Sequence, residues 1–282
     1  MEVFEFPDII KKSGAVLREV GTTNRTHLKD YEQAINARTK LILQVHTSNY
    51  LIRGYTKSVE LSELISLGKK YNIPVMSDWG SGSLVNMEKK IGIQETTIKS
   101  ILKKDPDLVT FSGDKLVGGP QSGLIVGKKK WVNLLKENTL YRTLRCNKIV
   151  ISLLEETLRT YRSKSFKKNN LSLMLLSKSR EDLRKEGIKI LNKINRGQIK
   201  KYNINLVETL VEAGSGSSPE QKLKSMALSF QSDEMGVNKI AKRFRMSFIP
   251  VVGYISENTF YIDLKALLPR QNIKLVKIIN NL

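Results

Sequence analysis

The sequence has few of the residues that build disulfides or membrane spans. It contains one cysteine, Cys146, in 282 residues, which excludes an internal disulfide framework. No apolar run approaches the roughly 20 residues that cross a bilayer. The N-terminus also lacks the basic-then-apolar order of a secretory signal. We therefore expect a cytoplasmic protein with no membrane association.

Aromatic residues are scarce, at 7%, and do not alternate with basic residues as they do in a base-stacking platform. Basic residues are plentiful: 48 Lys and Arg face 27 Asp and Glu, a formal net charge of +21. Such a field attracts polyanions such as RNA or phosphorylated ligands. The chain is also rich in Asn and Ile, a composition that A+T-rich coding produces without selection for binding. Charge alone therefore leaves RNA binding open.

Short apolar runs alternate with amphipathic stretches up to about residue 150. Strands are predicted at 40–45, 73–78, 108–111 and 123–127, and a helix at 59–71, where the leucines recur at helical spacing. This alternation predicts a mostly parallel sheet with helices on both faces. Ligands of such sheets bind at the carboxyl ends of the strands.

The pattern changes after a helix predicted at 149–161. Its basic tail, 162–170, is interpreted as a solvated connection. Beyond it we predict helices at 171–196, 237–244 and 272–280, strands at 202–211, 224–230, 249–255 and 259–264, and a flexible loop at 214–219. The sequence therefore predicts two domains, 1–162 and 163–282, the second a smaller α/β domain.

Three predicted strand ends carry chemically suggestive residues. Lys115 follows a strand and precedes a glycine-rich turn, the setting that a Schiff-base lysine needs, and Ser112 can donate to a phosphate. Asp78 ends the preceding strand and suits a pyridinium nitrogen, whose protonation makes the ring an electron sink. His46 and Asn49 follow the strand before that. Each residue alone is more often structural, and only their order along the chain is suggestive.

Longer motifs resemble bacterial selenocysteine synthases, the L-seryl-tRNA(Sec) selenium transferase family. They are Val20–His27, Val45–Tyr50, Asp78–Leu84, Thr110–Gln121 and Arg142–Lys148. The resemblance is close and collinear from about residue 1 to 162, and weaker at 251–255 and 261–269. It implies a fold-type-I transferase that depends on pyridoxal 5'-phosphate and acts on seryl-tRNA(Sec).

The resemblance implies a role for each matching residue around the cofactor. Lys115 would form the internal aldimine, and Asp114 would assist proton transfer. Asp78 would pair with the pyridinium nitrogen, and Ser112 would contact the phosphate. The remaining expected cofactor-binding residues are Ser81, His46 and Asn49.

Arg142 and Arg145 resemble the arginines that receive the selenium donor, selenophosphate. We expect them three residues apart on one helix and therefore on one face. A guanidinium offers a fixed fork of donors to phosphate oxygens. In the implied reaction Lys115 removes the Cα proton of the seryl group as a base, and the hydroxyl leaves as water to give a cofactor-bound dehydroalanyl intermediate. Selenophosphate then supplies the selenium of selenocysteinyl-tRNA(Sec). The resemblance also implies a homo-oligomeric ring of dimers, and no metal site is expected.

The sequence departs from the family in length. Family members carry a substantial N-terminal portion before the point where this chain begins, so we expect a tRNA-contacting domain and the first cofactor-domain elements to be missing. Trp79 stands where the family usually has a smaller aliphatic residue. Two alternatives stay open. One is another fold-type-I enzyme such as a cysteine desulfurase, although Cys146 lies in the arginine motif. The other is an inactive remnant that binds RNA by charge.

Overall fold

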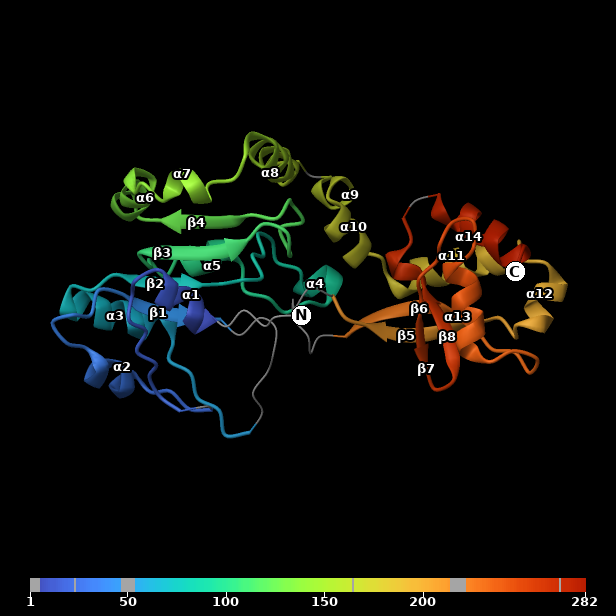
Figure 1. Ribbon diagram of the computed structural model, residues 1–282, viewed down its shortest axis with the longest axis horizontal. Helices are drawn as coiled ribbons and strands as arrows, with labels where there is room; N and C mark the ends of the chain where they lie inside the picture. The colour runs from blue at the N-terminus through green and yellow to red at the C-terminus, as the bar shows by residue number, and fades with distance from the viewer. Residues whose placement is uncertain (1–5, 23, 47–53, 164, 214–221, 269) are drawn as a thin grey trace.

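The computed structural model describes residues 6–22, 24–46, 54–163, 165–213, 222–268 and 270–282. Figure 1 shows two groups of elements, each built around a four-stranded sheet. The chain passes from the first group to the second through helices α8 (Lys148–Thr160), α9 (Phe166–Asn169) and α10 (Leu171–Leu176). No described helix is both long and apolar enough to cross a membrane.

The first sheet has the strand order β1 (Ile42–Val45), β2 (Val75–Asp78), β3 (Leu108–Ser112) and β4 (Gly123–Gly127). The first three strands are parallel, and β4 returns antiparallel to β3. The prediction of an α/β fold with a mostly parallel sheet is confirmed, and each of the four predicted strands forms.

Helix α3 (Leu61–Tyr71) covers β1 and β2 with its apolar side. It begins at a capping box in which Glu60 and Glu63 satisfy each other's backbone N–H groups. Gly68 permits close packing, because a Cβ there would lie 2.6 Å from the carbonyl of Ile73. The helix ends at Asn72, whose left-handed conformation turns the chain into β2.

The remaining helices of this group are short. They are α1 (Phe6–Lys12), α2 (Leu28–Ala34), α4 (Glu88–Ile91), α5 (Ile98–Leu102), α6 (Lys129–Glu137) and α7 (Tyr141–Leu144). The predicted helix α8 forms, but none of its residues is buried. Its apolar residues Ile149, Ile151 and Leu153 are 71%, 52% and 53% exposed. Much of the apolar surface of α8 is therefore exposed in this chain.

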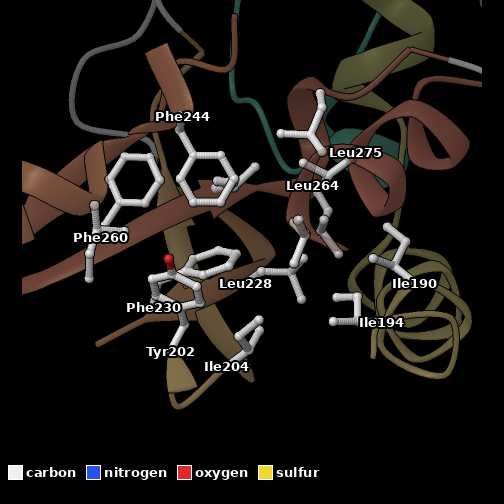
Figure 2. Close-up of a cluster of buried hydrophobic side chains, with 14 of the residues drawn as sticks. Ile190, Ile194, Tyr202, Ile204, Leu228, Phe230, Phe244, Phe260, Leu264 and Leu275 are labelled. Atoms are coloured by element: carbon white, nitrogen blue, oxygen red, sulfur yellow. The ribbon is translucent and has the colours of Figure 1, made fainter. Parts of the chain in front are cut away.

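The second sheet is antiparallel, with β6 (Leu223–Phe230) between β5 (Asn205–Val211) and β8 (Thr259–Asp263), and β7 (Tyr254–Ser256) at the edge. The elements around it are α11 (Arg180–Leu191), α12 (Arg196–Lys201), α13 (Val237–Arg245), η1 (Leu264–Ala266) and α14 (Gln271–Asn280). Phe230, Phe244 and Phe260 pack against one another in its core (Figure 2). The smaller C-terminal α/β unit is thus present.

Three predictions in the second half were wrong. The helix predicted at 171–196 is divided, because the Ser179 side chain caps a new helix by accepting from the backbone of Asp182. Of the strand predicted at 249–255, only the end forms, within β7. The tail at 162–170 is not merely solvated, because it contains α9 and the buried Asn170. The loop predicted at 214–219 lies outside the described residues.

A third apolar cluster joins the two groups of elements. Its members include Met87 and Leu116 from the first group, Leu173 of α10 and Leu223 of β6. All four are less than 5% exposed. The boundary at residue 162 stays a prediction, because side chains from both sides of it share this cluster.

Asp107 ties three elements together at the amino-terminal end of the sheet. Its Oδ2 accepts from the Val75 backbone at 2.9 Å, and its Oδ1 accepts from Trp131 Nε1 and pairs with Lys128 Nζ, both at 3.1 Å. Burial alone would raise the pKa of Asp107. The bonds from Val75, Lys128 and Trp131 outweigh it and hold the pKa below its ordinary value.

Replacing Asp107 with asparagine should lower the free energy of unfolding by about 1.5–3 kcal/mol, the range for hydrogen bonds to a charged group. Because folding lowers this pKa, the unfolded chain binds more protons in the acidic window below about pH 4, and stability falls with pH there. Urea unfolding between about pH 6 and about pH 3 should show a smaller decline for Asp107→Asn than for wild type. The exposed neighbour Asp105, changed to asparagine, is the control. Equal declines in wild type and Asp107→Asn would contradict this account.

Candidate active site

The carboxyl ends of β1, β2 and β3 lie side by side because the three strands are parallel. Val45 is opposite Asp78, and Asp78 is opposite Thr110. His46 therefore follows β1 beside Asp78, and its backbone N–H donates to the Asp78 carbonyl at 2.9 Å. Ser112 is the last residue of β3. The structure thus brings three predicted site residues, His46, Asp78 and Ser112, to one edge of the sheet.

The Asp78 side chain is oriented by its neighbour on β3. Thr110 Oγ1 donates to Asp78 Oδ1 at 2.6 Å, and both residues are half-buried. This bond fixes the orientation of the carboxylate. Because a carboxylate can accept about four hydrogen bonds, Asp78 can still accept one from the N–H of a ligand. Sequence reasoning missed Thr110, which the alternation of β3 places on the same face as Ser112.

Lys115 lies in the turn that follows β3. Gly113 N–H donates to the Ser122 carbonyl at 2.8 Å, and Leu116 N–H donates to the Ser81 carbonyl at 3.1 Å. A Cβ at Gly113 would lie 2.9 Å from the Pro120 carbonyl oxygen, so the turn requires glycine there. Lys115 is half-buried and Asp114 is exposed. The turn is therefore fixed on both sides of the lysine.

Two more distant side chains, Tyr161 and Asn170, form hydrogen bonds to the same turn. The Tyr161 hydroxyl donates to the Val117 carbonyl at 2.7 Å, and Asn170 Nδ2 donates to it at 2.9 Å. Burial raises the pKa of Tyr161, which keeps its hydroxyl protonated as a donor. Asn170 fits closely because Gly118, at φ +70°, has no side chain. Tyr161 and Asn170 thus pack against the fold and support the Lys115 turn.

Ser81 and His46 lie in a cluster on the other side of Asp78. Ser81 is fully buried, and its hydroxyl donates to Glu95 Oε1. The His46 ring stacks on Trp79, with centroids 3.8 Å apart. Burial lowers the pKa of His46, against the opposing effect of the Glu95 and Asp78 carboxylates, so the ring is neutral at about pH 7. Its Nδ1 is buried and has no hydrogen-bond partner among the described residues.

Arg142 and Arg145 do not share a helix face, which corrects the prediction. α7 ends at Leu144, and Arg145 is extended, with ψ 143°. The chain turns there because Asn147 caps α8 by accepting from the Val150 backbone. Both arginines are exposed. In Figure 1, α7, which contains Arg142, lies beyond β4 and away from the carboxyl end of β3.

The assembled groups suit a pyridoxal phosphate cofactor. Asp78 offers a carboxylate for a ring nitrogen, Lys115 an amine for the aldehyde, and Ser112 a hydroxyl for the phosphate. The Nδ1 of His46, which has no partner within the described part of the chain, is a further hydrogen-bonding atom at this edge. Gly82, at φ +69°, is required beside them, since a Cβ there would lie 2.7 Å from the Ser112 carbonyl. Asn49, the remaining predicted ligand, lies outside the described residues.

Comparison with known proteins identifies a family. The family model described as L-seryl-tRNA selenium transferase matches residues 2–268. An L-seryl-tRNA(Sec) selenium transferase of Clostridium botulinum is 40% identical over 267 residues, which are 95% of this chain and 58% of that protein. The protein of the same name from Maridesulfovibrio salexigens is 40% identical over 274 residues, 96% of this chain and 59% of its own length. The chain thus spans less than two thirds of these relatives.

Among solved structures, a D-glucosaminate-6-phosphate ammonia-lyase shares the fold. Its TM-score is 0.63 at 16% sequence identity, covering 97% of this chain and 65% of that one. At this identity the likeness concerns the fold alone. It agrees with the fold class predicted from the sequence.

Removing the Thr110 hydroxyl should disturb Asp78 without disturbing the sheet. Thr110→Val keeps the shape of the side chain but leaves Asp78 without its aiming bond. We expect cofactor affinity to fall by about tenfold or more, since a hydrogen bond to a charged group contributes about 1.5–3 kcal/mol. Absorbance titration with pyridoxal phosphate measures this effect, and Thr110→Ser, which retains the hydroxyl, is the matched control. Equal affinities for Thr110→Val and wild type would show that the bond does not orient Asp78 for the cofactor.

Proposed function

The chain belongs to the L-seryl-tRNA selenium transferase family, and on that premise we propose that it is the cofactor-holding part of an enzyme that converts L-seryl-tRNA(Sec) to L-selenocysteinyl-tRNA(Sec). The cofactor proposed for this part is pyridoxal 5'-phosphate, which the resemblance of its motifs implies. One observation carries the proposal: Asp78, Ser112 and the Lys115 turn meet at the carboxyl edge of one parallel sheet.

The bound cofactor would withdraw electrons from the Cα of the seryl group. Asp78 would hold the proton on the ring nitrogen, because its carboxylate is already aimed by Thr110. Ser112 would donate its hydroxyl to the phosphate. Lys115 would hold the cofactor through its amine and, once released, take the proton from Cα as a general base. Asp114, exposed beside it, would assist that proton transfer.

The arginines would serve the second substrate. Selenophosphate is an anion, and the exposed Arg142 and Arg145 offer guanidinium donors for its oxygens. Since α7 lies away from the Lys115 turn within one chain, we propose that the two meet across a subunit interface of the expected homo-oligomer. Cys146 lies beside Arg145, between α7 and α8 and not at the Lys115 turn, which favours selenium transfer over a cysteine desulfurase.

Trapping the cofactor tests the role of Lys115. Protein incubated with pyridoxal phosphate and then reduced with borohydride should carry the pyridoxyl label on Lys115, as located by peptide mass spectrometry. Lys115→Arg should remove the label, because a guanidinium does not condense with the aldehyde under these conditions. Lys128, another half-buried lysine, gives the comparison, since its ammonium is already paired with Asp107. Label on Lys128 with Lys115 free would rule out the assignment.

Conversion of seryl-tRNA(Sec) tests the activity itself. The chain matches 58% of the Clostridium botulinum protein, and much of the apolar surface of α8 is exposed. We therefore expect conversion only after the unmatched part of that relative is added, fused or as a second chain. The assay measures selenocysteinyl-tRNA(Sec) with and without that part, and with Lys115→Arg as the inactive control. Turnover by this chain alone would contradict the requirement for that part, and failure with it present would favour an inactive remnant.

A further inference from the structure

A carboxylate from another segment holds the turn that follows Asp78. Glu95 lies between α4 and α5, and its Oε1 accepts from Trp79 Nε1 at 3.0 Å and from the Ser81 hydroxyl. Trp79 and Ser81 flank Gly80, and Gly82 N–H closes the turn on the Trp79 carbonyl at 3.1 Å. One oxygen atom thus secures both sides of a tight turn.

The bond from Ser81 to Glu95 affects the turn that contains Lys115. Ser81 is fully buried, so removal of its acceptor would leave a hydroxyl without a partner in the interior. Its carbonyl accepts from the backbone N–H of Leu116, the residue after Lys115, at 3.1 Å. The position of Ser81 therefore determines where the Lys115 turn is anchored.

The bond from Trp79 to Glu95 affects the orientation of His46. The indole and imidazole rings are 3.8 Å apart and inclined by 18°, a stacked pair. The bond to Glu95 sets the rotation of the indole, and the stack passes that orientation to the imidazole. The His46 backbone is independently bound to Asp78. The buried Nδ1 of His46, without a partner among the described residues, is thereby aimed at a fixed point.

We propose that Glu95 is a positioning residue of the cofactor site, acting through Ser81 on the Lys115 turn and through Trp79 on His46. The inference rests on the proposed function, since it concerns where those two groups meet the cofactor. Glu95 itself contacts neither Lys115 nor Asp78 in any described hydrogen bond. Displacing a positioned group by about one ångström can lower the rate of an enzyme about a hundredfold. Hydrogen bonds from both Trp79 and Ser81 to Glu95 would prevent such displacements.

Two measurements on purified protein test the proposal. The chain has two histidines, His27 and His46, so the imidazole proton signals are readily assigned with His46→Asn. In wild type the His46 signals should be shifted upfield by the ring current of Trp79. Glu95→Ala should abolish that shift and weaken pyridoxal phosphate binding by about tenfold or more in an absorbance titration. Glu95→Gln, whose amide oxygen can still accept from Trp79, should retain most of the shift and of the affinity.

Glu88→Ala is the matched control, because Glu88 lies on the adjoining α4 and bonds Gln94 instead of the turn. It should change neither measurement. Should Glu95→Ala fail to fold, Glu95→Asp, whose shorter side chain withdraws the carboxylate, replaces it with the same expected losses. The proposal is overturned if the His46 shift survives in Glu95→Ala, or if it is lost while cofactor affinity is unchanged. Absence of cofactor uptake by wild type would instead overturn the proposed function, and the His46 shift would still decide whether Glu95 orients the rings.

Discussion

The parallel pairing of β2 with β3 is the constraint on which the site depends. It sets Asp78 opposite Thr110, and the hydrogen bond between their side chains holds that register at the carboxyl edge. A shift of one residue would turn Asp78 to the opposite face of the sheet and separate it from Ser112. Parallel strands need a crossover between them, and α3 and α5 provide the packed connections that bring each strand back to the same edge.

The turns after the strands depend on distant parts of the chain. The Lys115 turn is held by Ser81 from the preceding strand end, and by Tyr161 and Asn170 from the segment that leads to α10. These supports donate to or accept from backbone atoms, so they fix the position of the turn without using the Lys115 side chain. A loop that carries function on a rigid support of this kind is the usual arrangement in α/β enzymes.

The strands and the order of their ends could be predicted because buried runs and helical spacing are local signals. The residues that support the Lys115 turn could not be predicted, because Tyr161 and Asn170 lie 44 and 53 residues along the chain from the Val117 carbonyl that they bind. Glu95 could not be predicted either, because its local sequence shows only a charged residue between two short helices. The break at Ser179 and the extended Arg145 were missed for a related reason: in each case a side-chain cap on the next helix ends the previous one. The catalytic, cofactor-binding and substrate-binding roles assigned from the sequence all stay predictions.

Two lysines of the second unit, the half-buried Lys178 and the buried Lys265, show why place in the fold carries the proposal for Lys115. Burial lowers the pKa of both Lys178 and Lys265, a shift that often marks a catalytic amine. Yet Lys265 Nζ donates to the Lys178 carbonyl at 2.8 Å, and Lys178 Nζ donates to carbonyls of Leu264 and Leu267. The two ammonium groups join the connection between α10 and α11 to η1 and the residue after it, because buried carbonyls need donors. A lysine whose donors are already engaged by the backbone stabilises the fold, whereas Lys115 stands at the strand edge where ligands of this fold bind.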